Sequence, residues 1–185
     1  CMAIGGGYAI AMCNGHCVVV ALRRARERIL YENIHKSISM GAMPTQRMFF
    51  AEELKLSSEE YQLLECHATE FAALGFDMEY CGDDTISVIG RPAILDQSIA
   101  LDELMYELLH GIECGKMPID EERQRLAELM AQRGSAGYGH NLQTAECEEL
   151  LNTLFKCDDY SFTPSGAPIM AEITHDELRT KLARK

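Results

Sequence analysis

The chain has 185 residues, 47% of them hydrophobic and 25% charged, a composition typical of a folded protein with one domain or two small lobes. It carries 17 Lys and Arg against 29 Asp and Glu, a net charge of −12. DNA affinity comes largely from basic side chains that neutralise phosphates, so this charge argues against strong DNA binding by the chain alone. No apolar run approaches the roughly 20 residues of a membrane span and no signal peptide is visible, so we expect a cytoplasmic protein that does not enter a membrane.

The first half of the chain is predicted to alternate strands and helices. Periodicity and turn signals indicate a hairpin with strands at 8–12 and 16–21, then a helix at 22–40 and an extended segment at 45–56. A second helix at 57–74 and a second hairpin, with strands at 76–81 and 85–90, follow. Ser57 and Glu60 form a capping-box pattern at the start of the second helix, and Gly75 ends it.

The second half is predicted to be mainly helical. Helices are predicted at 101–112, 119–133 and 144–155. They are followed by a turn at 163–168, a short strand at 169–173 and a final helix from 174 onward. The whole order predicts an α/β (α+β) fold with mixed sheets and packed helices. No obvious linker divides the chain into two sequential domains, so an inserted lobe that leaves and rejoins one core fits the pattern.

The eight cysteines are scattered through predicted strands and helices, and none forms a Cys-x-x-Cys pair. We therefore expect small, reduced cysteines in a cytosolic protein. Cys13, His16 and Cys17 place three possible metal ligands within five residues. However, Asn14-Gly15 between two apolar runs is a strong hairpin-turn signal, and a structural zinc site normally needs a fourth ligand, so the hairpin is the favoured interpretation.

Several segments, in their order and spacing, resemble the C-terminal domain of the MutL family of mismatch-repair proteins. They are Tyr8-Ala-Ile-Ala with Val18-Val-Val20, Glu27-Arg-Ile-Leu-Tyr-Glu32, Leu74-Gly-Phe76 with Val88-Ile-Gly-Arg-Pro92, and Thr163-Pro-Ser-Gly-Ala-Pro168. The resemblance covers nearly the whole chain. It implies a dimerisation lobe from residues 1–52 plus 129–185 and an inserted external, regulatory lobe from 53–128. It also implies a separate N-terminal ATPase region, which the chain does not contain; its start at Cys1 is what we expect of a fragment.

In this family the motif Asp-Gln-His-Ala-x-x-Glu-Arg-x-x-x-Glu opens an endonuclease metal site. Here its Asp, Gln and His fall on Ala21, Leu22 and Arg23, and only the glutamates persist, as Glu27 and Glu32. Two further family motifs, near 131–137 and 163–168, have lost their Cys and His. Zinc or manganese needs several converging Cys, His or carboxylate donors. We therefore expect Glu27 and Glu32 to be remnants of a lost site, with no catalytic residue, bound metal or other cofactor in this domain; Arg23 and Glu27, four apart, are expected to pair.

A second motif of the family docks on the replication sliding clamp. Many members carry Gln-x-x-Leu-x-Pro just after this first helix, and here Gln46, Met48, Phe49 and Phe50 lie there, with Ala51 in place of Pro. Apolar anchors on an extended peptide suit a hydrophobic pocket. The alternative is an ordinary strand whose Met48 and Phe50 alternate into a core.

The resemblance implies a non-catalytic homodimerisation domain that tethers two ATPase regions and raises their effective concentration. The expected partners are a second copy, other mismatch-repair proteins and the sliding clamp, with DNA contacted mainly through the absent N-terminal region. By resemblance, the first hairpin supplies the dimer contacts, with candidates Ala9, Ala11, Val18 and Val20.

Two other functions remain open from the sequence. One is a metal-dependent DNA-nicking endonuclease with a rearranged site built from the two glutamates and some of His16, Cys17, His140 or His175. The other is an unrelated α/β binding domain that shares these motifs by chance and is a monomer.

Overall fold

The computed structural model describes residues 1–13, 15–41, 43–112, 118–140 and 142–183. The chain divides into two compact units: residues 1–29 with 135–185, and residues 30–134. The second unit is therefore inserted into the first, with boundaries at 29/30 and 134/135, whereas the lobes expected from the sequence meet at 52/53 and 128/129. The functions of those lobes stay predictions. Within the described residues, every helix is too short or too polar to cross a membrane.

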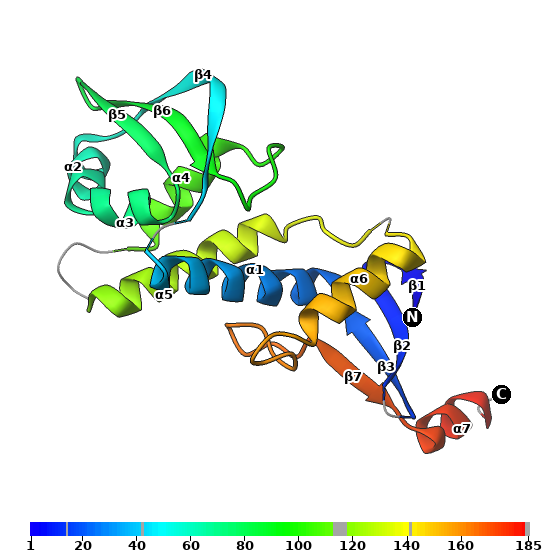
Figure 1. The fold of residues 1–185 in the computed structure, drawn as a ribbon. Helices are drawn as coiled ribbons and strands as arrows, with labels where there is room; N and C mark the ends of the chain where they lie inside the picture. The colour runs from blue at the N-terminus through cyan, green and yellow to red at the C-terminus, as the bar shows by residue number, and fades with distance from the viewer. Residues whose placement is uncertain (14, 42, 113–117, 141, 184–185) are drawn as a thin grey trace. The chain divides into compact units, whose positions relative to one another are not determined.

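The first unit is built on a four-stranded antiparallel sheet, called sheet A here (Figure 1). Its strands, in spatial order, are β1 (Met2–Gly5), β2 (Tyr8–Cys13), β3 (His16–Ala21) and β7 (Met170–Ile173). The β2–β3 hairpin falls where the sequence predicts it, and Gly15 has the positive φ, 85°, that such a turn requires. Asn14, the other turn residue, lies outside the described residues.

Two helices cover one face of sheet A (Figure 1). They are the start of α1 (Leu22–Ser39), which follows β3 directly, and α6 (Thr144–Leu154). The buried core between sheet and helices is apolar: Ala9, Ala11, Val18, Val20, Leu22, Ala25, Ile29, Cys147, Leu150, Leu151, Leu154 and Ile169. Burial of Leu22, Ala25 and Ile29 confirms the helical face that their spacing predicts. The unit ends with α7 (His175–Ala183), after β7.

The second unit contains a three-stranded antiparallel sheet with β6 in the centre. Its strands are β4 (Thr45–Lys55), β6 (Thr85–Pro92) and β5 (Asp77–Gly82). Its helices are α2 (Ser58–Cys66), α3 (Ala68–Ala73), α4 (Leu101–His110) and α5 (Ile119–Gly134). The predicted α/β (α+β) class with packed helices is confirmed, but the prediction of mixed sheets is corrected: each described strand pair in both sheets is antiparallel.

Two local features differ from the sequence prediction. Strand β1 was not predicted, because three apolar residues before three glycines give too short a pattern; it forms by pairing along β2, with Met2 opposite Ile10. The helix predicted at 57–74 is two helices that meet at His67, whose φ of −109° and ψ of 19° interrupt the first one. The capping box of Ser57 and Glu60 forms as predicted.

Candidate functional site

The face of sheet A opposite α1 and α6, called the outer face here, is apolar in every strand. Side chains alternate between the two faces of a strand, and the cross-strand register places one set together. The members of this set are Met2, Tyr8, Ile10, Met12, Cys17, Val19, Ala21, Ala171 and Ile173. All nine are hydrophobic, and each is exposed or partly exposed.

An antiparallel sheet that faces water on one side normally carries polar residues there. The outer face breaks this rule: Met12 is 68% exposed, Met2 56% and Tyr8 49%. A contiguous exposed apolar patch of this kind marks a surface that another molecule covers. The outer face is therefore the strongest candidate interaction surface of the first unit.

The four residues expected at a dimer interface lie on the opposite face. Ala9 and Val20 are fully buried, and Ala11 and Val18 are nearly so, all within the core formed with α1 and α6. Their side chains face the core of the protomer and not the outer face, and their place at a dimer interface stays a prediction. Both halves of the alternation are apolar in the sequence, so residue type alone did not separate the core face from the outer face.

The first turns of α1 carry Glu27, one of the two glutamates predicted to be remnants of a metal site. Glu27 is buried, with 3% of its surface exposed, and it accepts a hydrogen bond from the Arg23 guanidinium at 3.3 Å, which confirms the predicted pair. Burial raises the pKa of the Glu27 carboxyl, and the charges of Arg23 and Arg24 oppose that rise without cancelling it. The Glu27 carboxyl therefore has its hydrogen-bond partner in Arg23, on the same helix.

Glu32, the other remnant, lies five residues further along α1. At 3.6 residues per turn the two glutamates project about 140° apart around the helix, so they do not converge on one point. In the described part of the chain, no group of three or more His, Cys, Asp or Glu is placed to hold a metal ion. His16, one of the alternative ligands, instead contacts Glu172 of β7, with 2.6 Å between Nδ1 and Oε1.

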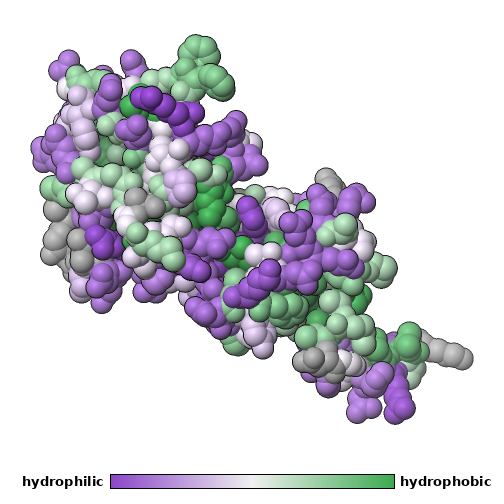
Figure 2. All heavy atoms as spheres, in the orientation of Figure 1, coloured by the Kyte–Doolittle hydropathy of each residue, from purple (hydrophilic) through white to green (hydrophobic). Residues whose placement is uncertain are grey.

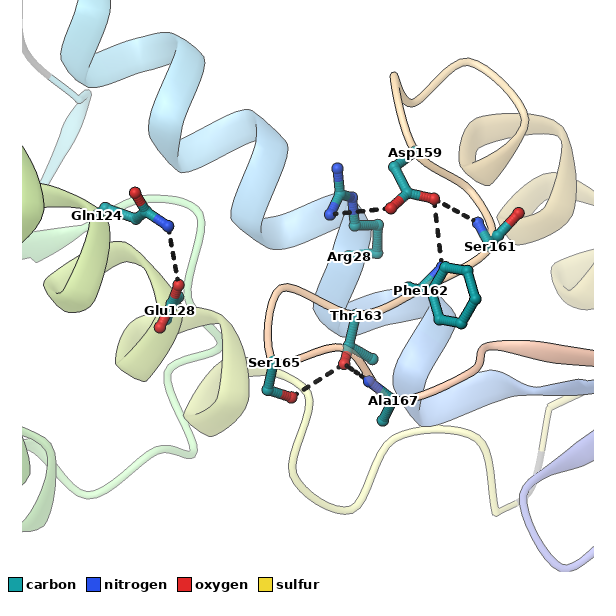
Figure 3. A network of polar contacts seen from close by, with 9 residues as sticks. All are labelled: Arg28, Gln124, Glu128, Asp159, Ser161, Phe162, Thr163, Ser165 and Ala167. Carbon is teal, nitrogen blue, oxygen red and sulfur yellow. Dashed lines mark hydrogen bonds and ion pairs between the residues drawn. The ribbon is translucent and has the colours of Figure 1, made fainter.

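The loop at 159–168 is held against α1 by two arginines, of which Figure 3 shows Arg28 beside Asp159. Arg24 donates a 2.7 Å hydrogen bond to the carbonyl of Pro168, and Arg28 lies 3.8 Å from a carboxylate oxygen of Asp159. The other oxygen of Asp159 accepts hydrogen bonds from the backbone amides of Ser161 and Phe162, at 2.8 and 3.3 Å. The sequence pattern did not reveal this role for Asp159.

Further along the same loop, Thr163 closes a tight turn (Figure 3). Its hydroxyl accepts from the amide of Ala167 at 3.0 Å and contacts the Ser165 hydroxyl at 3.0 Å, and Thr163 itself is buried. Hydrogen bonds within the loop and contacts with α1 thus hold residues 159–168 in place.

In the second unit, the clamp-like segment lies on β4, an edge strand. The ladder between β4 and β6 is irregular between Arg47 and Glu52. Within this irregularity Phe49 and Phe50 are 101% and 87% exposed, while Met48 packs against the core of the unit. Gln46, also exposed, sits opposite Arg91 in the ladder. Figure 2 shows a hydrophobic protrusion where Figure 1 places β4. Phe50 therefore does not alternate into the core.

The comparison with known families identifies this arrangement. The family described as "MutL C terminal dimerisation domain" matches residues 1–142, most of the chain, including the β1–β3 part of sheet A and the whole second unit. The chain belongs to the MutL C-terminal dimerisation domain family.

Proteins named DNA mismatch repair protein MutL match over almost the full chain. The protein of Endomicrobium trichonymphae is 27% identical over 178 residues, 96% of this chain and 30% of its own length. Those of Desulforamulus reducens and Bacteroides fragilis are 27% and 25% identical, over 96% and 94% of this chain and 28% of their own length. The chain thus spans less than a third of these MutL relatives.

Proposed function

We propose that this chain is the homodimerisation domain of a MutL-type mismatch-repair protein and that two copies pair through the outer face of sheet A. The observation that carries the proposal is the unbroken apolar composition of that face, in a chain whose family is defined by dimerisation. The face is the same surface on both copies, so a two-fold dimer pairs it with itself.

Sedimentation equilibrium tests this interface. Met12→Glu places a charge on the outer face, whereas Met40→Glu makes the same change at a site of comparable exposure, 76% against 68%, just after α1. We expect the outer-face variant to weaken the dimer by about tenfold or more and the control to leave it unchanged. Equal dissociation constants for the two variants would show that the outer face is not the dimer interface.

The dimer would tether two N-terminal ATPase regions of the parent protein in the cytoplasm and raise their effective concentration. In this arrangement the first unit is the dimerisation lobe and the inserted unit is the external, regulatory lobe. The net charge of −12 agrees with DNA being contacted mainly by the ATPase regions and not by this domain. Other mismatch-repair proteins would bind the assembled dimer.

We further propose that the domain is non-catalytic and binds no metal or other cofactor. Support comes from Arg23 and Arg24, which stand in the degenerate motif and hold Glu27 and the Pro168 carbonyl. A plasmid-nicking assay with Mn²⁺, together with metal analysis of the purified protein, tests this. Nicking by the wild type that Glu27→Gln abolishes would establish the endonuclease with a rearranged site in its place.

A sliding clamp is the proposed partner of the β4 segment, with Gln46, Met48, Phe49 and Phe50 as the docking residues. The exposure of the two adjacent phenylalanines supports it, since such side chains act as anchors in hydrophobic pockets. Replacing Phe49 and Phe50 with Ser should abolish binding to the clamp of the same organism. Tyr106→Ser, at an exposed aromatic residue of α4, is the matched control and should retain binding.

A further inference from the structure

Helix α7 is exposed along its whole length in the described part of the chain. None of its residues, 175–183, is buried, and Leu178 and Leu182 are 39% and 85% exposed. These leucines are four residues apart, so they form one apolar stripe on a helix that is otherwise polar. Figure 2 shows hydrophobic atoms at the surface of this part of the first unit.

The sequence nevertheless specifies a helix at this place. Thr174 and Glu177 form a capping box: the Glu177 amide donates to the Thr174 hydroxyl at 3.3 Å, and the Thr174 amide donates to the Glu177 carboxylate at 2.9 Å. A nine-residue helix is below the length of about 12–15 residues at which isolated helices become even marginally stable in water. Burial of the leucine stripe on another surface would therefore stabilise α7.

The position of α7 in the chain indicates which surface that is. Ile173, the last residue of β7, belongs to the outer face, and α7 begins two residues later. The helix therefore leaves sheet A at the border of the proposed dimer interface. Because the family of residues 1–142 is described by dimerisation, a second copy is the occupant that we assign to this border.

We propose that α7 is an exchanged arm, which packs its Leu178–Leu182 stripe on the second copy of the chain. This inference rests on the proposed outer-face dimer and deepens it, because it adds a contact that the sheets alone do not make. By two-fold symmetry each copy contributes one arm and binds the arm of the other, so one leucine substitution removes two contacts from the dimer.

The dissociation constant of the full chain tests the arm with two matched variants. Leu182→Asp and Thr180→Asp introduce the same residue into the same helix; Thr180 lies about 200° away from both leucines, on the other side of α7. Neither position is buried in the protomer, so both variants should fold. We expect Leu182→Asp to weaken dimerisation by about tenfold or more, and Thr180→Asp to leave it within about twofold.

Hydrogen exchange of amides 175–183 in the wild type gives the second readout. We expect protection of these amides to rise with protein concentration as the dimer forms. If Leu182→Asp dimerises like the wild type while Met12→Glu does not, or if protection of α7 is independent of concentration, the exchanged arm is wrong and the outer-face dimer stands. A wild type that stays monomeric overturns both.

Discussion

Two arginines near the start of α1, Arg24 and Arg28, join this helix to the loop at 159–168. Arg23, the arginine that stands at a ligand position of the family motif, pairs with Glu27 of its own helix. Here Arg24 binds the Pro168 carbonyl and Arg28 lies near Asp159, so the segments are joined by hydrogen bonds and ion pairs.

Substitution of Asp159 separates the two roles of this side chain. Asp159→Ala removes both the contact with Arg28 and the acceptor for the amides of Ser161 and Phe162, and should cost about 1–3 kcal/mol in the free energy of unfolding. Asp159→Asn keeps an acceptor oxygen and loses only the charge, so its cost should be the smaller. Urea unfolding curves measure both, and equal losses would mean that the turn hydrogen bonds contribute nothing.

Glu27 should make stability depend on pH in a definite direction. Burial raises the pKa of its carboxyl above the ordinary value of 4.5, so the folded chain holds this proton more tightly than the unfolded chain. The stabilisation from that proton is complete below pH 4.5 and is lost as the pH rises through the raised pKa. Glu27→Gln cannot ionise, so its stability relative to the wild type should increase over that window.

Thermal or urea unfolding between pH 4 and pH 8 measures the difference. Glu53→Gln, at an exposed position of β4, is the control and should track the wild type across the range. If Glu27→Gln instead loses stability relative to the wild type as the pH rises, the ion pair with Arg23 outweighs the cost of burial.

Among the elements, those with strong local signals were predicted well from the sequence. The β2–β3 hairpin, α1, and the capped starts of α2 and α7 follow from turn residues, apolar spacing and capping boxes. Strand β1 was missed because it depends on pairing with β2. The break at His67 was missed because the apolar spacing continues across it.

The candidate sites divide in the same way. Loss of the metal ligands can be read residue by residue from the motif, because it concerns residue identity. Which side of β2 and β3 faces a partner depends on where α1 and α6 pack, and both faces of these strands are apolar in the sequence. Likewise, only the irregular ladder of β4 shows that Phe49 and Phe50 lie outside the core.

Gly139 provides a test of how the chain re-enters the first unit beside α1. Its φ is +97°, and a Cβ there would lie 2.7 Å from the Cβ of Leu22. Gly139→Ala should therefore destabilise the fold by about 1–3 kcal/mol, through backbone strain and the clash. Gly137→Ala is the matched control: its φ is also positive, +73°, but nothing lies within 4 Å of the added Cβ, so it should cost less in the same unfolding assay.

For the whole molecule, the central proposal is that this domain dimerises through the outer face of sheet A. An exposed apolar sheet face and a family described by dimerisation support it. The pair of Arg23 and Glu27, at two positions of the family's metal motif, supports the separate proposal that the domain is non-catalytic.

Methionine oxidation as a function of protein concentration tests the claim most directly. Met12 on the outer face and Met40 after α1 are 68% and 76% exposed in the protomer, and oxidation of each to the sulfoxide can be followed by mass spectrometry. If the outer face forms the dimer interface, we expect Met12 to become protected from oxidation as the protein concentration rises through the dissociation constant, while Met40 does not. Dimer formation with Met12 and Met40 oxidised at the same unchanged rates would contradict it.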